Sequence, residues 1–129
     1  MKRWTLNTRE RTEFVDVTDR VAGAVADTGL ARGVATAYVP HTTAGITINE
    51  NADPSVVSDM IGTLERMVPW AGPYRHAEGN AAAHIKAALL GSSVQIPFED
   101  GRLCLGTWQG VYFCEFDGPR VRELWVQIL

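Results

Sequence analysis

Cysteine is scarce in this sequence, and long apolar runs are absent. Only Cys104 and Cys114 occur among 129 residues, too few for a fold that depends on disulfides. No apolar run approaches the roughly 20 residues that cross a bilayer, and the first residues lack the apolar core of a signal peptide. The sequence therefore predicts a cytoplasmic protein with reduced thiols, unless a hairpin brings the two cysteines face to face.

An excess of positive charge is also absent. The chain has 12 Lys and Arg against 15 Asp and Glu, which gives a formal net charge of −3. Proteins that bind nucleic acids usually carry a basic surface that neutralises phosphates. We therefore expect neither a nucleic-acid partner nor a membrane partner.

What the sequence does contain indicates one domain, residues 1–129. Hydrophobic residues make up 46% of the chain, enough for a core without disulfides. Helical spacing of apolar residues predicts helices at 18–28, 54–68 and 81–90. Alternating or short apolar patterns predict strands at 2–8, 13–17, 33–39, 44–49, 94–98, 102–106, 111–116 and 121–129.

The order of these elements indicates an α+β fold. Thr18 and Asn80 are suited to cap helices, and Asp53 followed by Pro54 is a strong helix start. Short connections between successive strands favour antiparallel pairing. We expect a largely antiparallel sheet packed with about three helices on one side.

A first polar cluster surrounds the predicted strand at 44–49. His41 and Thr42 precede this strand, and Glu50, Asn51 and Asp53 follow it. Structural roles explain part of the cluster, because Asp53 suits a helix cap and Asn51 suits a turn. A ligand-binding role for His41, Thr42 and Asn51, and a weaker metal-binding role for the two carboxylates, are the alternatives.

A second cluster holds the other two histidines. His76, Glu78 and Gly79 lie in a loop, Asn80 begins the following helix, and His84 lies one turn into it. The spacing of eight residues between the histidines excludes the HExxH motif of zinc proteases. Three histidines with a carboxylate suit a zinc site with one open position, and neutral imidazoles suit general acid and base catalysis. The residues leave both interpretations open.

The same segment suggests an anion site. Gly79 and Asn80 leave room for a ligand at the helix N-terminus, where backbone amides and the helix dipole favour negative charge. Lys86 follows His84 by two residues and so points away from it on the helix, unless the fold brings a phosphate between them.

A third cluster lies near the C-terminus. Trp108 and Gln109 occupy one glycine-bounded turn, and Arg120 lies in another. Two surface turns are the simpler interpretation. In the functional interpretation, Trp108 and Gln109 form a wall of a pocket and Arg120 binds an anion with its forked guanidinium.

Four stretches of this chain together resemble the YjbQ-like family. They are HTTAGITINENADP at 41–54, HAEGN continuing to HIKAALLGSS at 76–93, GRLCLGTWQG at 101–110 and EFDGPR at 115–120. The resemblance implies a compact α+β protein that forms a homotrimer. It also implies functional positions at His41, Glu50, Asn51, Asp53, His76, Glu78, Asn80, His84 and Lys86.

The activity name often attached to that family is secondary thiamine-phosphate synthase. This reaction needs cations that bind pyrophosphate, a magnesium ion held by carboxylates, and an aromatic surface for flat rings. Three histidines are not required by it. We therefore carry three hypotheses: a thiamine-phosphate synthase-like transferase, a zinc- or magnesium-dependent enzyme of other chemistry, and a non-catalytic trimer that binds a small molecule.

The shared prediction of these hypotheses concerns His41, His76 and His84. They are the only histidines of the chain, and each lies at an expected element boundary. We predict that they converge on one pocket that binds a phosphorylated small molecule or another anion.

Overall fold

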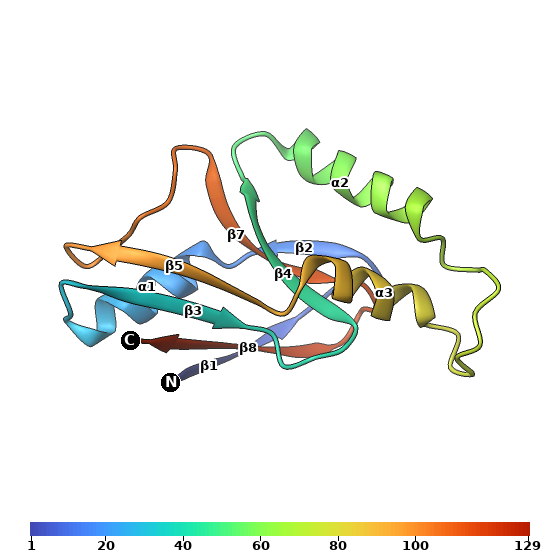
Figure 1. Cartoon of the computed structure of the whole chain (residues 1–129), viewed down its shortest axis with the longest axis horizontal. Helices are drawn as coiled ribbons and strands as arrows, with labels where there is room; N and C mark the ends of the chain where they lie inside the picture. Colours follow the sequence, from blue (N-terminus) through green and yellow to red (C-terminus); the bar gives the residue numbers. More distant parts are fainter.

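A computed structural model describes all residues, 1–129, as two antiparallel sheets and three helices (Figure 1). The predicted α+β class and the antiparallel pairing are confirmed. In chain order the elements are β1 (Lys2–Asn7), β2 (Glu13–Asp16), α1 (Thr18–Thr28), β3 (Arg32–Tyr38), β4 (Ala44–Glu50), α2 (Pro54–Met67), α3 (Ala81–Leu90), β5 (Ser93–Glu99), β6 (Arg102–Leu103), β7 (Gln109–Glu115) and β8 (Val121–Ile128).

The single sheet of the prediction is divided into two. One sheet has five strands in the order β1-β8-β3-β5-β6, and the other has three in the order β2-β7-β4. Only β5 and β6 form a tight hairpin, and Asp100 and Gly101 supply the left-handed backbone of its turn. The other strands pair across long stretches of sequence, which short-range patterns do not specify.

The main core lies between the two sheets and α1. Sixteen buried hydrophobic residues form it, drawn from both sheets and from one face of α1. A second, smaller cluster lies on the other face of β7, where Tyr112, Cys114 and Phe116 contact Ala83 and Ala87 of α3. One face of the three-stranded sheet therefore lies against the main core and the other against α3, so the helices do not share one side as expected.

Strand β7 is consequently covered on both faces. Val111 and Phe113 point into the main core, whereas Tyr112 and Cys114 point toward α3. This explains why residues 111–114 form a continuous apolar run rather than an alternating one. Burial also raises the pKa of the Cys114 thiol well above its usual range.

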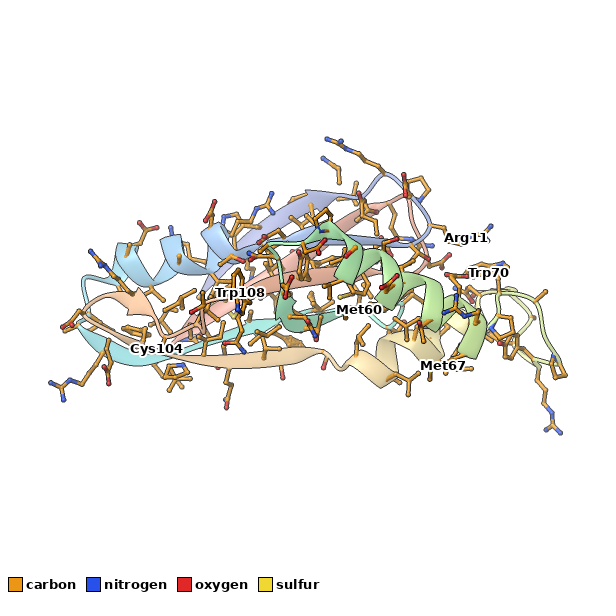
Figure 2. The ribbon with its side chains drawn as sticks, turned by 90° about the horizontal axis from the view of Figure 1, so that it is seen from above. Arg11, Met60, Met67, Trp70, Cys104 and Trp108 are labelled. Carbon is orange, nitrogen blue, oxygen red and sulfur yellow. The ribbon has the colours of Figure 1, made fainter.

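Helix α2 is the one helix of the chain without a fully buried residue. Figure 1 shows it standing off the three-stranded sheet. Asp53 begins it as predicted, because its side chain accepts a hydrogen bond of 2.9 Å from the amide of Ser55. Met67 at its far end is 64% exposed. Arg11 lies over the ring of Trp70, 4.2 Å from the ring centroid (Figure 2).

None of the three helices combines the length and the apolar character needed to span a bilayer.

Thr18 does not play its predicted capping role, and the cysteine pair that the sequence left open does not form. Thr18 does not cap α1, since its hydroxyl donates instead to Asp16 and accepts from the amide of Val111, which fixes the helix to β7. Cys104 and Cys114 do not face each other, because one is exposed beyond β6 and the other is buried in β7. Both thiols are free.

Helix α3 docks on β4 through a glycine. The amide of Ile46 donates to the carbonyl of Gly91 over 3.0 Å. A Cβ atom added at Gly45 would lie 2.8 Å from that same carbonyl oxygen and 3.3 Å from the Cβ of Leu90. Because neither atom belongs to a flexible side-chain end, Gly45 is required for the close approach of α3 to the sheet.

We expect Gly45→Ala to lower the free energy of unfolding by about 1–3 kcal/mol, the usual effect of overpacking a tight contact. The control is Gly23→Ala in α1, where nothing lies within 4 Å of the added Cβ and helix propensity should raise stability by up to about 1 kcal/mol. Urea unfolding of both variants checks this, and equal stabilities would contradict the docking described here.

Candidate functional site

A polar hollow of about 360 Å³ opens where three connections meet. These are the β3–β4 loop, the end of the loop before α3, and the turn between β7 and β8. Apart from one proline its lining is polar: Pro40, His41, Thr42, Thr43, Glu78, Asn80, His84, Arg120 and Arg122. Two arginines, two histidines and one acidic residue thus face one space.

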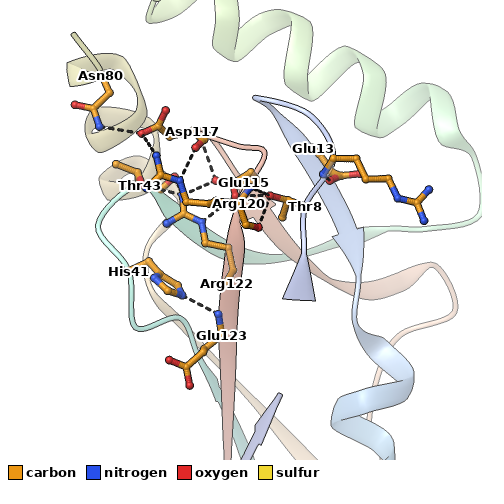
Figure 3. Close-up of polar contacts among 11 residues, drawn as sticks. Thr8, Glu13, His41, Thr43, Asn80, Glu115, Asp117, Arg120, Arg122 and Glu123 are labelled. Carbon is orange, nitrogen blue, oxygen red and sulfur yellow. Dashed lines mark hydrogen bonds and ion pairs between the residues drawn. The ribbon is translucent and has the colours of Figure 1, made fainter. Parts of the chain in front are cut away.

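Arg122 is the most deeply buried of these charged side chains. It is 3% exposed, and its partner Glu115 is fully buried. The Nε of Arg122 donates to Glu115 Oε1 over 2.8 Å, and Nη2 donates to Oε2 and, over 2.8 Å, to the hydroxyl of Thr43. The pair joins the end of β7 to the start of β8, and so ties the two sheets together beneath the hollow (Figure 3).

Glu115 is ionised in this setting. Burial alone would raise its pKa, but hydrogen bonds from Arg122, from the amide of Asp117 and from the hydroxyl of Thr8 outweigh that effect and hold the pKa below its usual range. A buried carboxylate and a buried guanidinium are tolerated because each satisfies the other.

These contacts do not occupy all the hydrogen-bond donors of the Arg122 guanidinium. Its protein hydrogen bonds engage Nε and Nη2 only, which leaves Nη1 without a protein partner. Nη1 is not sealed from solvent, since the one sealed side-chain polar atom without a partner is Asn80 Oδ1. Because Arg122 lines the hollow, Nη1 is a pre-positioned donor for a ligand there.

Arg120 repeats this arrangement nearer the surface. Its Nε donates to the carbonyl of Asp117 over 2.8 Å and its Nη2 to Asp117 Oδ2 over 2.9 Å. The side-chain amide of Asn80 donates to the same carboxylate oxygen over 2.9 Å. Asn80 therefore does not cap α3 as expected; it links the start of α3 to the β7–β8 turn.

His41 is held as a neutral imidazole. Its Nε2 accepts the backbone N–H of Glu123 over 2.8 Å, so the ring proton lies on Nδ1. Burial lowers the pKa of His41, the positive charge of Arg122 lowers it further, and Glu115 and Glu123 only partly oppose this. At neutral pH, Nδ1–H is the group that His41 has to offer a ligand.

His84 and His76 form a contact of their own. Their ring centroids are 5.2 Å apart in an edge-to-face arrangement, and Nε2 of His76 lies 3.8 Å from a carboxylate oxygen of Glu78. His84 lines the hollow together with His41, whereas His76 does not line it and borders it through His84 and Glu78. The structure places the three histidines close together, but only His41 and His84 line the hollow.

The structure brings several of the predicted site residues together at the hollow. His41, Thr42, Glu78, Asn80, His84 and Arg120 line the hollow, Gly79 lies between two of them with a left-handed backbone, and His76 is adjacent.

Lys86 is not among them. It is 1% exposed, and its Nζ donates over 2.9 Å to Glu65 of α2, which also accepts from the hydroxyl of Thr12. Its position two residues beyond His84 turns it away from the hollow, as helix geometry requires. Lys86 holds α3 to α2, and within this chain it does not reach a ligand in the hollow.

Glu50, Asn51 and Asp53 lie at the far end of β4 from His41. The strand between them has seven residues, roughly 20 Å at the usual rise. Asn51 donates to Asp16 over 3.0 Å, and its backbone amide bonds the carbonyl of Trp108. Within one chain these residues are therefore separated from the histidines.

Trp108 and Gln109 belong to that far end too. Trp108 is 62% exposed, and Gln109 accepts the amide of Gly106 within their shared turn. Figure 2 shows Trp108 at a distance from Trp70, which marks the end of the molecule near α3. In one chain the predicted aromatic wall and the histidine hollow are not the same place.

The donor geometry also bears on metal binding. No three His, Cys, Asp or Glu side chains lie close enough together to hold one ion. His41 could ligate a metal only by giving up its hydrogen bond from Glu123 or by losing its Nδ1 proton. One chain alone therefore does not supply the zinc or magnesium centre suggested by His41, His76, His84, Glu50 and Asp53.

Sequence reasoning missed Arg122 and Glu115. A signal was present in the alternation of β8, where Arg122 occupies the same inward-facing phase as Leu124 and Val126. Glu115 likewise interrupts an apolar run that is buried on both faces. Opposite charges at two such positions indicate a buried pair.

The fold and the hollow define a single-domain α+β protein of two antiparallel sheets with a polar, histidine-lined site. A family model described as UPF0047 protein YjbQ-like matches residues 2–129, and the chain belongs to this family.

Relatives and solved structures agree. UPF0047 protein YugU of Bacillus subtilis is 48% identical over 130 residues, covering 100% of this chain and 98% of the relative. UPF0047 protein MJ1081 of Methanocaldococcus jannaschii is 50% identical over 127 residues, covering 98% and 92%. A crystal structure of an uncharacterized conserved protein of the yjbq/upf0047 family from Clostridium acetobutylicum has a TM-score of 0.99 at 52% identity, with all of both chains covered.

We expect Glu115→Gln to lower the free energy of unfolding by about 3–5 kcal/mol at pH 7, because it leaves Arg122 buried without a counter-charge. The control is Lys2→Met, which removes the exposed pair with Asp27 and should cost no more than about 1 kcal/mol. Chemical unfolding of both variants measures this contrast.

Measuring the free energy of unfolding of the wild type and Glu115→Gln at several pH values tests whether Glu115 is ionised. Because the folded-state pKa of Glu115 is below its ordinary value of 4.5, its contribution is complete above about pH 4.5 and is lost as the pH falls toward the folded-state pKa. The wild type should therefore lose more stability than Glu115→Gln in this acidic window. Parallel pH profiles would contradict an ionised, paired Glu115.

Proposed function

We propose that the hollow binds the phosphoryl group of a small molecule. The observation that carries this proposal is the hydrogen bonding of two arginines at the hollow. The carboxylate of Glu115 holds Arg122 through Nε and Nη2. Arg120 is held through Nε by the backbone carbonyl of Asp117 and through Nη2 by the Asp117 carboxylate. Both arginines line the hollow, and each leaves Nη1 without a protein partner. A forked guanidinium fixed in advance suits phosphate, because little side-chain entropy is lost on binding.

Neighbouring groups support an anionic ligand. Nδ1–H of His41 adds a neutral donor, and the N-terminus of α3 directs its dipole toward the hollow through Asn80. Glu78 opposes an anion, but its side chain is 76% exposed, so water and salt screen its charge. The balance favours a phosphoryl group bound closer to the arginines than to Glu78.

We infer that the bound molecule is also transformed, with His84 as the proton donor or acceptor. His84 lines the hollow and contacts His76, and an imidazole exchanges protons readily near neutral pH. The narrower proposal is a thiamine-phosphate synthase-like transfer. Its aromatic surface and its magnesium ligands would have to come from Trp108, Glu50 and Asp53 of a second subunit, because they lie far from the hollow in their own chain.

Two alternatives remain separable by experiment. A zinc- or magnesium-dependent enzyme would bind one of these metals with the participation of His76 and His84, and metal titration of the purified protein detects it. A non-catalytic trimer would bind phosphate compounds without changing them, and incubation followed by ³¹P NMR separates it from an enzyme.

We expect Arg120→Met to weaken binding of inorganic phosphate and pyrophosphate roughly 10- to 100-fold, the usual effect of losing a charged hydrogen bond. Calorimetric titration measures this. Arg120 is the better position to change, because its side chain is half exposed and supports no core contact.

The matched control is Arg66→Met on α2, whose guanidinium contacts only Thr63. It should bind phosphate as the wild type does. Arg120→Lys keeps the charge but loses the fork, and it should fall between the two. Unchanged phosphate affinity in Arg120→Met would overturn the proposal.

We also propose that the chain forms a homotrimer, as the family resemblance implies. An apolar groove of about 450 Å³ lies along α2 and α3, lined by Val56, Met60, Leu64 and Leu90 among others. Ile85 and Leu89 of α3 are 40% and 56% exposed. Association would cover these side chains and would support α2, which has no fully buried residue of its own.

Leu89→Glu should therefore shift the sedimenting species at micromolar concentration from three chains to one, because a carboxylate would have to be buried at the contact. The control is Leu30→Glu, at another exposed leucine, which lies just after the C-terminus of α1. A wild type that sediments as a single chain would contradict the proposal.

A further inference from the structure

A second hollow of about 420 Å³ adjoins the first. The two hollows share His41, Thr42 and His84, so these three residues form the boundary between them. The remaining lining comes from the start of β4 and the C-terminal half of α3 with the residues that follow it: Ala44, Ala87, Ala88, Gly91 and Ser92.

The two hollows differ in chemistry. The first carries two arginines and Glu78, whereas the second carries no Asp, Glu, Lys or Arg side chain. Ala88 follows His84 by four residues and thus lies one turn further along the same face of α3. The second hollow is therefore bounded by small, uncharged side chains on the side away from the arginines.

We propose that the ligand has two parts: a phosphoryl group in the first hollow and a compact, uncharged organic group in the second. The proposal rests on the phosphate site proposed above. It is carried by Arg122, a charged side chain that is more than nine-tenths buried and keeps Nη1 unpaired at one hollow, together with the shared boundary to the other. Inorganic phosphate alone would leave the second hollow unoccupied.

The substrate class follows from this arrangement. The organic group is about the size of one ring or a short chain, because the second hollow is at the small end of the roughly 300–1,000 Å³ of small-molecule sites. The bond that joins the two parts lies between His41 and His84, since these side chains border both hollows. A phosphate monoester with a small neutral group fits this description.

The test fills the second hollow without touching the first. Ala88 is exposed and lies within α3, so Ala88→Leu introduces a good helix former and should leave the fold intact. The matched control is Ala26→Leu, an exposed alanine within α1 and outside both hollows. The probes are inorganic phosphate, phenyl phosphate and glycerol 2-phosphate, titrated by calorimetry.

We expect the wild type and Ala26→Leu to bind at least one of the two esters about ten times more tightly than inorganic phosphate. Ala88→Leu should lose this advantage and bind inorganic phosphate unchanged. Esters that bind no better than inorganic phosphate, or an ester preference that survives in Ala88→Leu, would overturn the two-part site and leave the phosphate site standing. If no phosphate compound binds the wild type, the proposed function itself fails.

Discussion

The pair between Arg122 and Glu115 is the interaction on which the rest of the site depends. It lies where the two sheets meet, on strands that do not pair with each other, and it is held further by Thr8 and Thr43. Additional hydrogen bonds offset much of the cost of removing an ion pair from water. Thr8 and the amide of Asp117 supply them to Glu115, and Thr43 supplies one to Arg122, whose Nη1 has no protein partner.

This constraint accounts for the character of the hollow above the pair. The fixed positive charge of Arg122 helps to keep His41 neutral, and the backbone of β8 selects which nitrogen of His41 carries the proton. The turn from β7 to β8 places Arg120 beside Arg122 and links it to the start of α3 through Asp117 and Asn80. Donors from three connections are thus oriented before a ligand arrives, which lowers the entropic cost of binding.

Much of the fold could be predicted from sequence, because helix spacing, strand alternation and the turn at Asp100 and Gly101 are local signals. The division into two sheets could not, since it depends on pairings such as β1 with β8, which join opposite ends of the chain. The histidines could be identified as site candidates because the chain contains only three of them. Arg122 and Glu115 were overlooked because their significance depends on which strand faces which. The burial of Lys86 could not be predicted because its partner, Glu65, lies on another helix.

In the proposed site, Arg122 and Arg120 present unpaired guanidinium nitrogens to a phosphoryl group beside His41. The most direct test is a crystal structure of the wild-type protein grown with phosphate. It should show one anion in the hollow, within about 3 Å of Nη1 of Arg122 and in contact with Nη1 of Arg120 or Nδ1 of His41. An empty hollow at saturating phosphate, or an anion bound elsewhere while Nη1 of Arg122 contacts only protein, would contradict the account.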